Sequence, residues 1–176
     1  MHTVTPNPSI ERTSQGLRPC AASHVKRSPM NTADWYFGLI TREVDLDDPR
    51  EKDLAQKFMI DALYRVTADL PPEARDAAAV ANRFATGVAS ADDIEKERVR
   101  LWNSIKGRDI SDEINVLRIR TAIHVLYPPE ALEMHDAIDS FLAFWFRGGL
   151  SESKLCSFSE SLWANNQSQR IVCGTR

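Results

Sequence analysis

Two histidines and an aspartate have a spacing that could hold a metal ion. His135 and Asp139 are four residues apart, so on a helix they would share one face, and imidazole and carboxylate are both zinc ligands. His124 precedes them and could add a third ligand from a neighbouring helix. However, His135 also continues an apolar stripe, which favours a partly buried, hydrogen-bonded histidine. We therefore expect no cofactor, and a small metal-dependent helical enzyme is the alternative.

Other catalytic motifs are missing from the sequence. It contains no G-x-S-x-G nucleophile motif and no glycine-rich phosphate loop. The three cysteines, Cys20, Cys156 and Cys173, are widely spaced and form no C-x-x-C pair, which argues against a zinc knuckle or a disulfide framework. This cysteine usage favours a reducing compartment. Together, the missing catalytic motifs and the cysteine usage favour a cytoplasmic protein that is not an enzyme.

The segment "FLAFWFRGG" (141–149) is the richest in aromatic residues. At 100° per residue its large side chains cannot all face one way. We expect this helix end to be buried on all sides. In the alternative, part of it is exposed and binds a protein partner or a second copy of the chain. The contact residues would then be Phe144, Phe146, Arg147 and Trp163, whose types are enriched at interfaces.

The net charge of −3 conceals an uneven distribution. Residues 1–29 contain four basic residues and one acidic residue, so the remaining chain carries a net charge of −6. Nucleic-acid binding needs concentrated Lys and Arg, which this body lacks, so we expect no nucleic-acid partner. No apolar run is long enough for a membrane span, so we expect no membrane association. An acidic body would suit a basic protein partner.

Apolar residues recur at helical spacing, and strand signals are scarce, so the expected fold is all-α. Asp48-Pro49 and the Ser90–Asp93 pair are typical helix starts, and Gly87 is a typical helix end. The helix after residue 110 is apolar on more than one face and should be central. About seven helices are expected, at approximately 31–45, 49–68, 72–86, 91–105, 111–126, 129–147 and 151–165.

The expected domain organisation is simple. Residues 1–29 are polar and proline-rich, which predicts a disordered N-terminal extension, and translation could start at Met30 rather than at Met1. Residues 30–168 would form a single helical domain, and residues 169–176 a C-terminal tail.

The chain contains a pattern that occurs twice. "LPPEA" (70–74) and "YPPEA" (127–131) are 57 residues apart, and a Leu-Trp pair follows each, ending at Trp102 and at Trp163. The second copy has four extra residues, about one helical turn, which keeps the apolar stripe nearly in phase. The pattern predicts two pseudo-repeated three-helix units, about 50–106 and 110–165, packed as stacked helical hairpins.

The stretch "ARDAAAVANRFATGVASADDIEKERVRLW" (74–102) resembles a segment of small all-helical bacterial immunity-like proteins. The shared features are an alanine-rich helix, a turn with Gly and Ser, and a charged helix that ends in an aromatic residue. The resemblance implies a non-catalytic cytoplasmic protein that binds and blocks one toxin, which for an acidic inhibitor would be a basic protein. A homodimeric scaffold built through the Phe144–Phe146 region is a further alternative.

Overall fold

The computed structural model describes residues 29–128 and 133–155. Within these ranges the chain forms six α-helices and one short 3-10 helix and contains no strand, which confirms the all-α prediction. The expected extension up to residue 28 lies outside the described residues. So do most of the second Pro-Pro motif, the last expected helix beyond residue 155 and the C-terminal tail.

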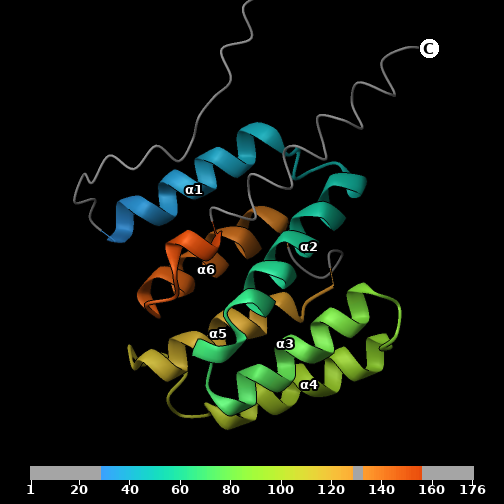
Figure 1. Cartoon of the computed structure of the whole chain (residues 1–176), viewed down its shortest axis with the longest axis vertical. Coiled ribbons are helices and arrows are strands. Elements are labelled where there is room, and N and C mark those ends of the chain that lie inside the picture. The colour runs from blue at the N-terminus through green and yellow to red at the C-terminus, as the bar shows by residue number, and fades with distance from the viewer. Residues whose placement is uncertain (1–28, 129–132, 156–176) are drawn as a thin grey trace, which may run out of the picture.

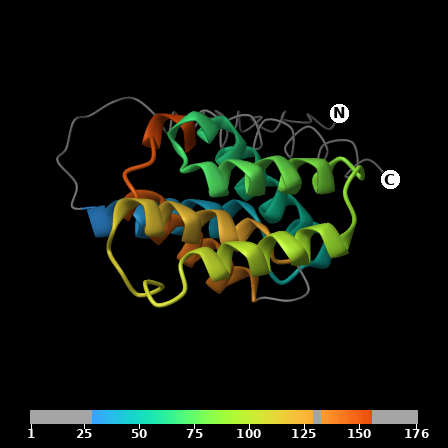
Figure 2. The same cartoon turned by 90° about the horizontal axis from the view of Figure 1, so that it is seen from below.

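The helices pack around a shared apolar core (Figure 1). Helix α5 contacts α2, α3, α4 and α6, so it is the central helix, as its apolar faces predicted. Helix α1 covers α6, while α3 lies against both α2 and α4. Figure 2 shows α3 and α4 joined by a short turn at one end. The elements are α1 (Pro29–Glu43), α2 (Pro49–Arg65), the 3-10 helix η1 (Thr67–Asp69), α3 (Pro72–Ala85), α4 (Ala91–Ser104), α5 (Ile114–Val125) and α6 (Met134–Arg147).

The predicted helix starts are confirmed. The Asp48 side chain accepts a hydrogen bond from the Arg50 amide at 2.8 Å, and Pro49 is the first residue of α2. The Ser90 hydroxyl accepts from the Asp93 amide at 3.2 Å, and the Asp93 carboxylate accepts from the Ser90 amide at 2.9 Å. These bonds satisfy backbone amides at the two helix starts. The Ser90 amide and the Ser90 hydroxyl both donate to the Asp93 carboxylate, which lowers the pKa of Asp93.

Helices α3 and α6 end in the same kind of turn. Gly87 follows α3 with φ of 74°, and Gly149 follows α6 with φ of 65°. In both turns the next amide bonds back to the carbonyl five residues earlier, from Val88 at 2.7 Å and from Leu150 at 3.1 Å. The sequence pattern pairs Gly87 with Gly148, but the backbone geometry pairs it with Gly149. The turns also differ in burial, because Val88 is 74% exposed whereas Leu150 is 4% exposed.

Arg118 joins the end of α6 to the corner between α2 and α3. Its Nε donates to the Gly148 carbonyl at 2.9 Å, and its Nη1 donates to the Asp69 carbonyl at 2.6 Å. Both carbonyls lie at helix ends, where no intrahelical amide can reach them. The side chain therefore caps two helix termini at once.

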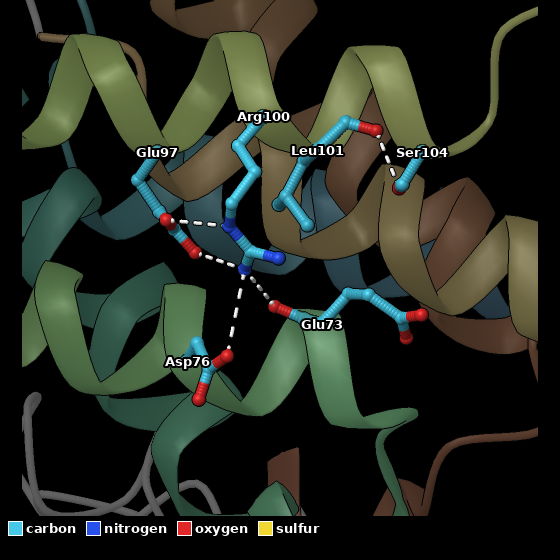
Figure 3. A network of polar contacts seen from close by, with 6 residues as sticks. All are labelled: Glu73, Asp76, Glu97, Arg100, Leu101 and Ser104. Atoms are coloured by element: carbon cyan, nitrogen blue, oxygen red, sulfur yellow. Dashed lines mark hydrogen bonds and ion pairs between the residues drawn. The ribbon is translucent and has the colours of Figure 1, made fainter.

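Arg100 fastens α4 to α3 (Figure 3). Its Nε donates to Glu97 at 2.9 Å, the helical neighbour three residues earlier. Its Nη2 donates to the Glu73 carbonyl at 2.9 Å and lies 3.7 Å from the Asp76 carboxylate on α3. These groups are partly solvated, so each ion pair contributes little. Together they hold this part of α4 against the start of α3.

The glycines give a matched test of these helix ends. Gly87→Ala and Gly149→Ala should each lower the free energy of unfolding by about 1–2 kcal/mol, because a Cβ is disfavoured at positive φ. Gly38→Ala should raise it by about 1 kcal/mol, because Gly38 lies inside α1 and its Cβ would make only an ordinary contact, 3.9 Å from Arg42. Urea unfolding measures all three. Equal effects at the three positions would contradict the assigned turns.

Candidate binding surface

A run of aromatic rings and arginines crosses α4, α5 and the start of the next loop before it reaches α6. We call it the aromatic–arginine strip. It follows the line of α5 that the neighbouring helices leave partly uncovered, at positions 120 and 124, and continues to position 127. Its members are Arg98, Trp102, Arg120, His124, Tyr127 and Phe144.

At the α4 end of the strip, Tyr127 is held by two residues of α4. The Trp102 indole Nε1 donates to the Tyr127 hydroxyl at 3.3 Å, and the Arg98 guanidinium carbon lies 4.5 Å from the centre of the Tyr127 ring. Arg98 also donates to the Leu126 carbonyl at 3.2 Å. Trp102 is 37% exposed, and Val99, one turn earlier on α4, is 51% exposed. This end therefore presents apolar and aromatic surface to solvent.

At the α6 end, Phe144 lies against two residues of α5. The His124 ring is stacked on Phe144 with 5.4 Å between ring centres. The guanidinium carbon of Arg120 lies 3.9 Å from the centre of the same ring, within the range of a cation–π contact. Within the described ranges, Arg120 makes no hydrogen bond and no ion pair. It is thus a half-buried cation whose only described partner is an aromatic face.

Burial is the main influence on the charge of Arg120, and neighbouring charges of both signs act on it as well. Burial lowers the pKa of Arg120, and repulsion by Arg147 lowers it further, while Asp109 and Asp112 act in the opposite direction. Arg147 forms an ion pair with Asp112. The α6 end therefore holds two arginines near one another, and one of them has its own carboxylate.

His124 is held in its neutral form. Burial, followed by the nearby Arg120 cation, lowers the pKa of His124 from 6.5 to about 4. Its Nδ1 atom is buried and has no hydrogen-bond partner in the structure. A buried polar atom without a hydrogen-bond partner lowers the stability of the folded state. The stack of the His124 ring on Phe144 is therefore formed at some cost in stability.

The aromatic end of α6 is buried on most sides, as the favoured interpretation of the sequence predicted. Phe144 is 7% exposed and lies under Arg120, whereas Phe146 is half-buried and stacks on Tyr36 of α1 at 5.5 Å. Arg147 is exposed and paired with Asp112. Of the four contact residues predicted from the sequence, Phe144 therefore lies in the strip and Arg147 next to it. Trp163 lies outside the described residues.

The sequence interpretation did not identify Arg98, Trp102, Arg120 or Tyr127 as contact residues. One signal could have found part of this surface, because Arg120, His124 and Tyr127 are spaced by four and three residues within an apolar segment. That spacing places them along one line of a helix. The contribution of Arg98 depends on how α4 crosses α5, which the spacing within one helix does not encode.

The structure does not place the three predicted metal ligands next to one another. His124 is stacked in the strip, whereas His135 is exposed on α6, 3.9 Å from Asp47 and against the Phe37 ring. Among the residues that the structure describes, no group of three His, Cys, Asp or Glu side chains could share a metal ion. His124, His135 and Asp139 are therefore not brought together.

The expectation that His135 is partly buried was wrong. The buried face of α6 includes Met134, Ala137, Ile138 and Phe141. His135 lies about 100° around the helix from Met134, which turns it towards solvent. His124, one helix earlier, is the histidine that is largely buried.

A second surface feature is an acidic hollow of about 360 Å³ between the end of α1 and the start of α6. Thr41 to Asp47 and His135 line it. Among its acidic residues, Asp45 accepts a hydrogen bond from the Asp47 amide at 3.1 Å. Glu51, which lies outside the hollow, accepts from the Asp45 amide at 2.5 Å. The Asp45 carboxylate is thus engaged in the local turn.

Comparisons with protein-family models, with curated proteins and with solved structures find no match to the chain. Among the helices described here, none is both long and apolar enough to cross a membrane.

Acid titration tests the environment of His124. The folded chain favours neutral His124, so the unfolded chain takes up the proton first as the pH falls below 6.5. The stability contributed by the neutral ring is therefore present above pH 6.5 and is lost as the pH falls towards 4, by a total on the order of 3 kcal/mol. His124→Phe keeps a stacking ring and removes the titration. Urea unfolding of both proteins between these pH values should show a shallower loss for the variant, and parallel curves would contradict the assignment.

Proposed function

We propose that the chain is a non-catalytic protein-binding module and that the aromatic–arginine strip is its contact surface. The observation that carries the proposal is the exposed Trp102 beside Tyr127 and Arg98. Trp, Tyr and Arg are the residue types that dominate binding energy at protein interfaces. Here they are already fixed by contacts with each other, so a partner would not need to order them.

The more specific version is an immunity-like inhibitor that blocks a toxin in the cytoplasm. Its support is the resemblance of residues 74–102, which include most of α4 and end at Trp102. The net charge of −6 on the body favours a basic partner overall, because opposite charges accelerate association. The acidic hollow is a second candidate surface for such a partner.

We also propose that the fold arose by duplication of a three-helix unit packed as stacked helical hairpins. Three predicted pairs of equivalent positions are buried in both copies: Met59 with Val116, Val66 with Ile123, and Ile94 with Leu155. The matching glycine turns after α3 and α6 add support. In this arrangement Arg98 and Trp102 of the strip belong to the first copy and its other members to the second. The first copy has Thr67 at the position of His124.

A pair of aromatic variants tests the binding surface. Tagged wild-type chain is used to capture partners from extracts of the source cells, in parallel with Trp102→Ala and with Tyr64→Ala. Tyr64 is also an exposed aromatic residue, but it lies on α2 outside the strip. A specific partner should be retained by wild type and Tyr64→Ala and should bind Trp102→Ala about 2 kcal/mol more weakly, which is the loss expected of a binding hot spot.

Two measurements complete this test. Circular dichroism must show equal helicity for the three proteins, so that loss of capture reports on contact and not on folding. Light scattering gives the oligomeric state of each. A partner that the two variants bind equally well would contradict the strip as the surface. A wild-type dimer that Trp102→Ala dissociates would identify a second copy of the chain as the partner.

A further inference from the structure

We propose that two copies of the chain associate through one exposed face of α4, with the two α4 helices antiparallel across a twofold axis. This α4 face consists of Glu95, Val99, Trp102 and Lys106, all of them exposed. The inference rests on the proposed function, because Trp102 belongs to the aromatic–arginine strip. It adds the identity of one partner of that surface, namely a second copy of the chain.

Helix α4 lies at the edge of the bundle (Figure 1). Its main contacts among the described elements are with α3 and α5, and its buried residues are Ile94 and Leu101. Val99 and Trp102 lie on another side, where they are 51% and 37% exposed. The described helices thus leave two large apolar side chains of α4 next to each other and in contact with water. Such a patch is a typical site of protein association.

The four residues of the α4 face follow one line along the helix. They are spaced by four, three and four residues, which keeps them within a sector of about 60°. Lys106 follows the last residue of α4, but its amide bonds to the Asn103 carbonyl at 3.4 Å, so the chain continues to turn in the helical sense. The apolar pair therefore lies in the middle of the line, with an acid at one end and a base at the other.

This order of side chains makes the α4 face complementary to itself. A twofold axis that passes midway between Val99 and Trp102 places Val99 opposite the second copy's Trp102. The same axis places Glu95 opposite the second copy's Lys106, and each of these contacts occurs twice. A parallel arrangement would bring like charges together instead. The charge pattern therefore selects a second, antiparallel copy as the occupant.

The two charges at the ends of the α4 face have no other described role. Within the described ranges, the side chains of Glu95 and Lys106 form no ion pair and no hydrogen bond. By contrast, Glu97 on the neighbouring side of α4 is paired with Arg100. Glu95 also lies beyond the first turn of α4, where the helix dipole no longer favours an acidic residue. Both side chains are therefore available to a second copy.

The net charge of the body opposes self-association, but it acts over a longer distance than this contact. Two bodies of charge −6 repel each other, and at physiological ionic strength charges more than about 8 Å apart are largely screened. The contact is also small beside that of a permanent dimer, so the expected dimer is weak and reversible. A different protein that binds Trp102 would compete with the second copy.

Charge reversal tests the antiparallel pairing. Sedimentation equilibrium of the full-length chain between about 10 µM and 1 mM, at physiological ionic strength, should show a monomer–dimer equilibrium. Glu95→Lys and Lys106→Glu should each raise the Kd of the dimer by about tenfold, because two repulsive pairs replace two attractive ones. The double variant should return the Kd to within about threefold of wild type, because it only exchanges the partners of each pair.

A mixture of the two single variants gives the sharpest result. The lysine introduced at position 95 of one variant then faces the glutamate introduced at position 106 of the other, and the native Lys106 and Glu95 face each other on the second side of the axis. The mixture should form heterodimers at concentrations at which each variant alone is a monomer. Absence of heterodimers, or a wild-type dimer that both single variants leave intact, would overturn the pairing.

Matched controls separate the contact from the net charge. Asp53→Lys and Lys57→Glu make the same changes of charge at exposed positions of α2, which has no substantial contact with α4. Each should leave the Kd within about twofold, as expected for charges far from a contact. Circular dichroism must show equal helicity for all variants. Equal losses in the controls, or a wild-type monomer up to about 1 mM, would overturn the proposal.

The proposed function is tested separately by the capture with Trp102→Ala and Tyr64→Ala. A monomeric wild type that captures another protein through Trp102 would overturn the dimer and leave the strip as a contact surface. A dimer that responds to the charge variants, with no effect of Trp102→Ala on the capture of another protein, would support the α4 contact and count against the strip as the surface for that protein.

Discussion

The burial of α5 is the constraint on which the rest of this structure depends. Four helices pack against it, and almost all of its apolar side chains are removed from water. Every polar residue on this helix must therefore find a partner or lie along the one line left partly uncovered. Arg118 finds partners, because it donates to two carbonyls. Arg120 and His124 lie along the partly uncovered line. The strip is a consequence of how the core closes, because a rotation of α5 that covered this line would bury the Arg120 cation.

The polar atoms without partners show what this arrangement costs. The Nδ1 atom of His124 and the Nε1 atom of Trp145 are both buried without a hydrogen bond. Each such atom opposes folding, because it loses water and gains no replacement. Trp145 lies deep in the core and fills volume there, so its large apolar area compensates for its N–H group. His124 lies at the edge of the core, where its ring supports Phe144.

Much of the fold could be predicted from the sequence, because helix signals are local. Asp48-Pro49 and the Ser90–Asp93 pair act through hydrogen bonds within one turn, and both occur as expected. The candidate binding surface was harder to predict from the sequence. The spacing of residues does not reveal how two helices cross, so the contact of Arg98 with Tyr127 was not predicted. The exposure of His135 was misjudged because neighbouring residues of a helix point in different directions. Met134 lies on the buried face of α6, and His135, one residue later, lies on the solvent face.

The double cap made by Arg118 has a mechanical consequence. The Arg118 guanidinium is hydrogen-bonded both to the end of α6 and to the 3-10 helix before α3. Movement of one of these helix ends is therefore coupled to movement of the other. Arg147 precedes Gly148 directly, and Asp69 lies in the corner where α2 gives way to α3. A displacement of the last turn of α6 would therefore also move the adjacent corner between α2 and α3. One side chain thus couples the positions of two helix ends that are far apart in the sequence.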